Sequence, residues 1–383
     1  MALRSRGLIV PTVVILLVTP ACAAHAVPSS DGANSALQLP SVPASDSRPA
    51  DTTSILKKLT KDVVIGSTVD AKSGDKGPRA LSIVVKTKGA LTVGQLLVCN
   101  FENSAGVAGN GTTMELLNPK PGSQPIRFIQ SGSIKGCDGD AISRSHTVYG
   151  AGLTSGDIAE ISDKGALVRT YSGNTIGAPF ADSDALPEQS FSPEYIYAGT
   201  TASGGITSIS IGFYGNGLAL QVAKGFGVTK PSAQGELGPS GLQYNKGIDT
   251  LYIVDGVTNT LVAFSSASKL LDKDEIIVKP GGKNFTCKHP STTCASLVYS
   301  GSPLDAPMAS TLLPNGNLIV ANTKGTANTL VELTPQGQVL DTKVVDTNST
   351  QGVFGLAAHG KNDSDTVLFF TDTNSNTVQE LER

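Results

Sequence analysis

Tryptophan is absent from this sequence, and histidine and charged residues are scarce: there are four histidines, and Asp, Glu, Lys and Arg make up 16% of 383 residues. With a formal net charge of −3 and no basic stripe, the chain is not expected to bind nucleic acid. No P-loop, zinc-protease or GxSxG motif occurs, and no His, Ser and Asp spacing suggests a triad. The sequence therefore displays none of the common hydrolase signatures.

Long apolar runs are also missing. The longest hydrophobic segment, Leu8 to Val18, has 11 residues, which is too short to span a bilayer. It follows Arg4 and Arg6 and precedes the small-residue triplet "AHA" at Ala24–Ala26. A positive start, an apolar centre and a small-x-small site are typical of a secretory signal. Residues 1–26 are therefore predicted to be a signal peptide, with the mature protein secreted or periplasmic and without a transmembrane segment.

An alternative reading of the same region starts from "TPAC". Cys22 follows a small residue and would be the lipid-modified cysteine of an anchored lipoprotein, although Pro20 fits that pattern poorly. Ordinary cleavage would remove Cys22. The following residues, 27–53, are rich in Ser, Ala, Pro and Asp and have no apolar periodicity, which predicts a disordered linker.

Four cysteines remain after the signal. An even number in an exported chain favours two disulfides. Cys287 and Cys294 are seven residues apart and would pin one loop, which leaves Cys99 and Cys137 to pair with each other. A zinc site would need closer CxxC-type spacing.

Glycine, by contrast, is abundant, with 42 residues, and Thr, Ser and Asn fill the gaps between short apolar runs. One unit recurs six times: an apolar strand, a short polar turn and a second apolar strand, as in "TLYIVDGVTNTLVAF". The gaps between successive starts are 51, 48, 56, 67 and 49 residues. The six units start at Leu96, Thr147, Tyr195, Leu251, Leu318 and Val367. A period near 50 residues with β-branched strands predicts the blades of a β-propeller, and the long gap indicates an insertion around Cys287–Cys294.

The chain ends support six blades in a closed ring. The last hairpin finishes at Leu381, so the sixth blade lacks its outermost strand. A spare strand-like run, "DVVIGSTV" at Asp62–Val69, would supply it and remove an exposed edge. We therefore predict an all-β, six-bladed β-propeller over residues 54–383, closed by an N-terminal strand. Two unrelated β-sandwiches are the alternative.

The inner strands carry a further pattern. "SGLQYN" at Ser240, "MASTLLPNGN" at Met308 and "FGLAAHGKND" at Phe354 each precede a recurring hairpin. This arrangement resembles NHL-type repeats and covers Asp62–Arg383. Propellers with similar blades include lactonases, strictosidine-synthase-like enzymes, streptogramin lyases and interaction scaffolds, so the resemblance implies the fold and leaves the activity open.

Loops inside the hairpins and loops leading into the innermost strands are expected to share one face of the ring. They are rich in oxygen-bearing side chains, which calcium or magnesium would require. Turn formation is the alternative role of the same residues, because Asp and Asn bond their own backbone in loops. The candidate metal ligands are Asp138, Asp140, Asp182, Asp184 and Asp305, with Asn100 and Asn322 as carbonyl donors for ion or ligand binding.

Two enzyme resemblances are incomplete. Lactonases of the SMP-30 and gluconolactonase group hold their ion with a Glu from the start of the first blade, two Asn and an Asp. Here the first acidic residues of that blade are Asp70 and Asp75, followed by Glu102 in a loop. Streptogramin lyases need a His with acidic partners at the ring opening, and no histidine of this chain is expected there.

The favoured prediction is a monomeric binding module for a protein, peptide, glycan or small molecule. A small-molecule hydrolase or lyase is the alternative.

Overall fold

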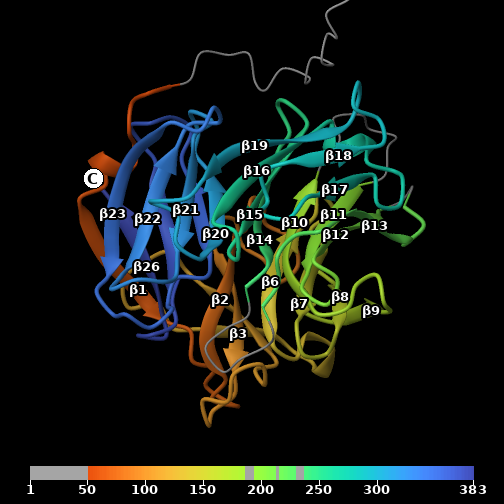
Figure 1. Cartoon of the computed structure of the whole chain (residues 1–383). Coiled ribbons are helices and arrows are strands. Elements are labelled where there is room, and N and C mark those ends of the chain that lie inside the picture. Colours follow the sequence, from red (N-terminus) through yellow and green to blue (C-terminus); the bar gives the residue numbers. More distant parts are fainter. Residues whose placement is uncertain (1–50, 186–193, 213–214, 230–236) are drawn as a thin grey trace, which may run out of the picture. The chain divides into compact units, whose positions relative to one another are not determined.

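The computed structural model describes residues 51–185, 194–212, 215–229 and 237–383, with the backbone alone for 181–185. Six β-sheets form a ring, so the prediction of a six-bladed propeller is confirmed (Figure 1). The predicted signal peptide 1–26 and most of the predicted linker 27–53 lie outside the described residues. No helix among the described residues is long and apolar enough to cross a membrane.

The first three blades follow each other along the chain. Blade 1 consists of β2 (Lys76–Ile83), β3 (Leu96–Glu102), β4 (Thr113–Leu117) and β5 (Ile126–Gln130). Blade 2 consists of β6 (Cys137–Ile142), β7 (Val148–Gly152), β8 (Asp157–Ile161) and β9 (Leu167–Tyr171). Blade 3 contains β10 (Pro179–Ala185), β11 (Glu194–Thr200), β12 (Gly205–Ile211) and β13 (Ala219–Lys224), together with β17 (Ile276–Val278) and β18 (Phe285–Cys287).

The other three blades complete the ring. Blade 4 consists of β14 (Pro239–Asn245), β15 (Thr250–Asp255), β16 (Thr260–Ser265) and β19 (Cys294–Ser300). Blade 5 consists of β20 (Pro307–Leu312), β21 (Leu318–Asn322), β22 (Asn328–Leu333) and β23 (Val339–Asp346). Blade 6 consists of β24 (Leu356–His359), β25 (Val367–Asp372), β26 (Thr377–Glu382) and β1 (Lys61–Ser67). Three short 3₁₀ turns accompany the strands: η1 (Leu56–Lys58), η2 (Gly132–Ile134) and η3 (Ala267–Lys269).

The ring closes as the chain ends predicted. Strand β1 pairs antiparallel with β26, from Lys61 opposite Glu382 to Ser67 opposite Thr377. Figure 1 shows the two strands side by side although they come from opposite ends of the described chain. This pairing covers the edge that β26 would otherwise expose and joins the termini of the propeller.

The apolar runs of the hairpins reflect burial on two sides. All six residues of β15 are buried, because neighbouring blades cover both faces of the sheet. One cluster, for example, joins Cys99 and Met114 of blade 1 to Val148 and Ile161 of blade 2. Each fully buried aliphatic side chain contributes about 1.5–3 kcal/mol to folding. Packing between blades therefore stabilises the ring and holds the inner strands in fixed positions.

The long gap in the repeat is an insertion that serves the preceding blade. It lies between β16 and β19 of blade 4, yet β17 pairs parallel with β13 at the outer edge of blade 3. Strand β18 then pairs antiparallel with β17. The insertion thus covers the outer edge of blade 3.

Both predicted disulfides are present. Cys99 and Cys137 join β3 of blade 1 to β6 of blade 2, and both side chains are fully buried. Cys287 and Cys294 join the end of β18 to the start of β19. One bond therefore fastens an inner strand, and the other fastens the insertion to blade 4.

Candidate ligand-binding cavity

A cavity of about 320 Å³ lies between the innermost strands of the six blades. Strands β2, β6, β10, β14, β20 and β24 all contribute lining residues, so every blade forms part of the wall. Much of the lining is apolar, including Leu81, Leu242, Met308 and Leu356. Its volume is within the range of small-molecule sites, about 300–1,000 Å³.

One side of the cavity carries a buried carboxyl group. Asp140 of β6 is 7% exposed, and its Oδ1 accepts a hydrogen bond of 2.9 Å from the Ser82 hydroxyl of β2. Its Oδ2 has no hydrogen-bond partner among the described residues. Burial raises the pKa of Asp140 to about 7, and the hydrogen bond from Ser82 opposes that rise. Asp140 is thus a desolvated carboxyl group that titrates near neutral pH.

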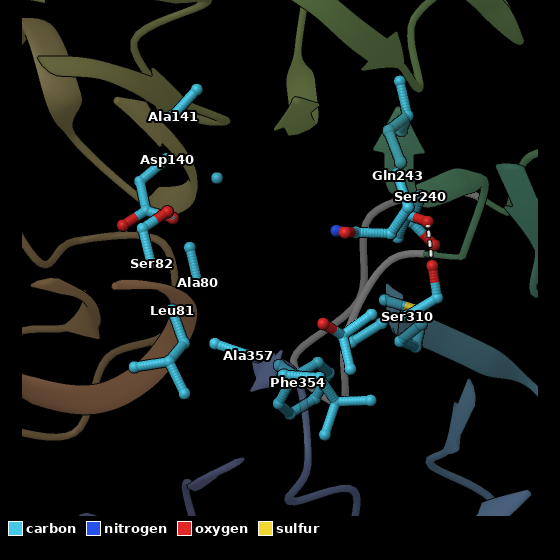
Figure 2. A pocket seen from close by; sticks show the side chains of 18 of the residues that line it. Ala80, Leu81, Ser82, Asp140, Ala141, Ser240, Gln243, Ser310, Phe354 and Ala357 are labelled. Atoms are coloured by element: carbon cyan, nitrogen blue, oxygen red, sulfur yellow. Dashed lines mark hydrogen bonds between the residues drawn. The ribbon is translucent and has the colours of Figure 1, made fainter. Parts of the chain in front are cut away.

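The other side of the cavity carries uncharged polar groups. Ser240, Gln243 and Ser310 lie together there, across from Ser82 and Asp140 (Figure 2). The Ser310 hydroxyl donates to the backbone oxygen of Gly241. The Ser240 hydroxyl, on a side chain that is 1% exposed, has no partner among the described residues. The cavity therefore offers a carboxyl oxygen on one side and a hydroxyl on the other.

A buried ion pair lies near one end of the same strands. Arg79 of β2 donates to Asp138 of β6 at 2.9 Å, and both side chains are almost fully buried. The guanidinium carbon of Arg79 lies 3.6 Å from the ring centroid of Phe101 and 4.2 Å from that of Phe354. Contacts of a cation with aromatic faces are favourable, and more so when desolvated. Arg79 thus compensates the charge of Asp138 and links blades 1, 2 and 6.

The sequence placed four candidate acids in loops leading into the inner strands, and that placement was wrong. Asp138 and Asp140 lie within β6, while Asp182 and Asp184 lie within β10. Inner strands border the cavity at the ring axis and tolerate Gly and Asp, so they lack the apolar pattern that marks the other strands. The side chains of Asp182 and Asp184 lie outside the described residues.

The other candidates fasten loops at the hairpin end of the ring. Asn100 donates from Nδ2 to the backbone oxygen of Thr68 at 2.8 Å. Asn322 accepts from the backbone N–H of Asp305 at 3.0 Å and donates to the backbone oxygen of Pro303 at 2.7 Å. These contacts hold loop backbone that is distant in the sequence, and Oδ1 of Asn100 has no partner among the described residues.

A divalent ion is not favoured by the described donors. In the part of the chain that the structure describes, no three His, Cys, Asp or Glu side chains lie close enough to share an ion. One carboxylate oxygen of Asp138 already accepts a hydrogen bond from Arg79. The described residues thus do not provide the oxygen-rich set that calcium or magnesium requires. A site that also uses Asp182 and Asp184 stays a prediction.

Four cavity residues were missed at the level of sequence: Ser82, Ser240, Gln243 and Ser310. Ser and Gln in a short strand look like ordinary solvent-facing residues. The usable signal was their position, since three of them lie in the segments that precede recurring hairpins and Ser82 lies in the first inner strand. Knowing that inner strands border a cavity would have singled them out.

Comparisons with known proteins support the fold alone. No protein-family model matches the chain, and no curated protein matches it. A gluconolactonase of Xanthomonas campestris superposes with a TM-score of 0.53 at 12% identity, covering 88% of this chain and 98% of that one. A protein of unknown function from Bacteroides thetaiotaomicron gives 0.50 at 12%, covering 83% and 74%. Virginiamycin B lyase from Staphylococcus aureus gives 0.47 at 12%, covering 84% and 98%. This chain is therefore similar in architecture to six-bladed propeller-like proteins.

Proposed function

We propose that this protein is an exported β-propeller that binds a small polar molecule in its central cavity. The observation that carries the proposal is a pair of unpartnered polar atoms, Asp140 Oδ2 and Ser240 Oγ, on buried side chains of the same cavity. Buried polar groups are nearly always hydrogen-bonded, and leaving one unpaired costs about 1–3 kcal/mol. A ligand with matching polar groups would recover that free energy.

A small molecule suits this site better than a protein, peptide or glycan. The unpartnered atoms Asp140 Oδ2 and Ser240 Oγ lie on innermost strands that border the same cavity, whereas Asn322 at the hairpin end is bonded to loop backbone through both Oδ1 and Nδ2. A concave site of this volume that combines apolar residues with convergent polar groups is typical of small-molecule pockets. The proposal thus narrows the predicted binding module to the central cavity.

Export is supported by the cysteine chemistry. Two disulfides among the described residues are typical of an oxidising compartment. The predicted signal peptide agrees with a secreted or periplasmic protein. Anchoring through Cys22 remains the alternative, and mass spectrometry of the mature N-terminus would distinguish the two.

A second candidate function is a hydrolase or lyase. The observation that favours it is Asp140, because a carboxyl group with a pKa of about 7 is well matched to proton transfer at neutral pH. In that case Asp140 would take or give a proton and Ser82 would orient it. Incubating the protein with glucono-1,5-lactone and following ring opening by NMR, with Asp140→Asn as the comparison, tests this candidate.

Binding is tested by thermal unfolding of the full exported protein against a panel of small amines, polyols, sugars and carboxylates. A ligand that binds the folded state raises the unfolding temperature. We expect at least one class to stabilise the wild type and the control Asp62→Asn, which alters an exposed carboxyl on the outermost strand β1. Filling the cavity with Ser240→Leu, or with the smaller Ser240→Val, should abolish the shift.

Two results would contradict cavity binding. One is the absence of any shift across the panel. The other is an equal shift in the wild type and in whichever Ser240 variant retains its native circular dichroism spectrum.

A further inference from the structure

The charges in the cavity wall do not balance. Asp138 and Asp140 are the ionisable side chains among its described lining residues. Arg79 pairs with Asp138 at 2.9 Å. From the described residues, Asp140 receives only a neutral hydroxyl donor, that of Ser82. When both acids are ionised, the described wall therefore carries one negative charge that no cation in it compensates.

The position of that charge matters as much as its sign. Asp140 is 7% exposed, lies beside Ala141 and faces a cavity that Leu81, Leu242 and Met308 also line. Taking a charge out of water costs several kcal/mol unless it is paired. Hydrogen bonds between ionised partners are about twice as strong as neutral ones. A cationic donor would therefore gain more at Oδ2 than a neutral donor would.

We propose that the ligand is a small primary amine whose ammonium group pairs with Asp140 Oδ2 and whose other end bonds to Ser240. This inference rests on the proposed cavity binding and specifies its ligand. A polyol would meet the hydrogen-bonding need of Oδ2 and leave the charge uncompensated. A carboxylate would be repelled. The apolar lining between the two polar sides fits a hydrocarbon or aromatic middle.

The pairing implies a dependence on pH. Because the carboxyl group of the empty cavity titrates near pH 7, an ammonium ligand must bind the ionised form and displace a proton. The ionised fraction rises about eightfold between pH 6 and pH 7.5 for a group with that pKa. Amine affinity should rise by a similar factor, with release of a proton. The affinity of a neutral ligand should stay level or fall.

Three probes with one skeleton test the inference: tyramine, its neutral alcohol tyrosol and its acid 4-hydroxyphenylacetate. Isothermal titration of the full exported protein would be run at pH 6 and pH 7.5, in two buffers of different ionisation enthalpy. At pH 7.5 we expect tyramine to bind at least tenfold more tightly than tyrosol, and the acid not to bind. The tyramine advantage should shrink about eightfold at pH 6.

Variants separate the residues involved. Asp140→Asn should remove the advantage of tyramine over tyrosol, whereas the control Asp62→Asn should leave it unchanged. Ser240→Ala should weaken both probes by a similar factor. Circular dichroism spectra of the variants establish that each is folded.

Several results would overturn the amine inference. Tyrosol or the acid could bind as tightly as tyramine, or tyramine affinity could be insensitive to Asp140→Asn. If tyrosol or the acid then bound the wild type but not Ser240→Leu, the cavity would still be a binding site. The inference that its ligand is an amine would be rejected. Failure of tyramine, ethanolamine and methylamine to bind at millimolar concentration would overturn it as well. Binding of sugars or polyols in the wider panel would still support cavity binding.

Discussion

The hairpin end of the ring and the central cavity use similar polar residues in opposite ways. At the hairpin end Asp255 is fully buried, and its carboxylate accepts from the backbone N–H groups of Val257 (2.9 Å), Thr258 (3.3 Å) and Gly227 (3.2 Å). In the cavity Asp140 is also buried, yet its Oδ2 has no partner among the described residues. The first arrangement satisfies a buried carboxylate within the fold, and the second leaves a carboxyl oxygen beside the cavity without a partner among the described residues.

This contrast shows how a site can be recognised in a chain rich in Asp, Asn, Ser and Thr. Residue type does not distinguish the two regions, because both contain acids and hydroxyl groups. For Asp255 and Asp140 the difference is the number of hydrogen bonds that the carboxyl group accepts from the described residues. Four predictions test the contrast, from the largest expected effect to the smallest.

The disulfides are expected to differ most. Cys99–Cys137 closes 38 residues and fastens cavity strand β6, whereas Cys287–Cys294 closes seven residues of the insertion. Loop-closure entropy predicts a loss of about 4 kcal/mol for Cys99→Ala with Cys137→Ala, and about 2 kcal/mol for the other pair. Urea unfolding of both double variants measures the difference. Equal losses would contradict a loss that is set by the length of the closed loop.

Asp255 should be needed for stability. Asp255→Ala leaves three backbone donors without their acceptor, so we expect a loss of about 3 kcal/mol. Asp255→Asn retains one acceptor oxygen and should lose about 1 kcal/mol. Urea unfolding checks both values. If Asp255→Ala left the free energy of unfolding unchanged, Asp255 would contribute no net stabilisation, and the contrast with Asp140 would fail.

Asp140→Asn should have the opposite sign and depend on pH. The pKa of Asp140 is raised in the folded state to about 7, from about 3.9 in the unfolded chain. The folded protein therefore loses stability as pH rises through the window from 4 to 7, by about 4 kcal/mol in total.

The amide variant avoids that loss. The unpaired NH₂ group of the asparagine offsets part of this stabilisation. We therefore expect the variant to be about 2 kcal/mol more stable than the wild type at pH 8. The gain should vanish towards pH 4. Urea unfolding of the wild type and Asp140→Asn across this range measures it. A pH-independent difference would contradict the burial of an ionisable Asp140.

The two cavity serines should differ least. Ser310→Ala removes a hydrogen bond to Gly241 and should lose about 1 kcal/mol. Ser240→Ala removes a hydroxyl without a partner among the described residues and should be neutral or slightly stabilising. Thermal unfolding of both variants in the absence of ligand tests this matched pair. A larger loss for Ser240→Ala would reveal a structural partner for its hydroxyl.

The fold was largely predictable from the sequence because its determinants are local. A strand, turn and strand recur at intervals near 50 residues, and the missing strand at the C-terminus matches a spare one near Asp62. The even number of cysteines and the seven-residue spacing of Cys287 and Cys294 were sufficient to predict the disulfides. The parallel pairing of β17 with β13 was not predictable, because it joins segments of different blades and follows no period.

The site was less predictable because it depends on contacts between blades. The sequence singled out Asp140 but could not show that Ser82, from another blade, would be its donor. Nor could it show that Arg79 would compensate Asp138. The resemblance to NHL-type repeats indicated a propeller correctly, while the NHL assignment itself stays a prediction.

The central claim is that Asp140 is a buried carboxyl group without a compensating partner, and its own titration tests this most directly. The protein would be labelled with ¹³C at the aspartate carboxyl carbon, and the Asp140 signal would be assigned by its loss in Asp140→Asn. We predict a midpoint near pH 7 for the free protein and a lower midpoint with tyramine bound. A midpoint near the ordinary value of about 3.9 would contradict the account.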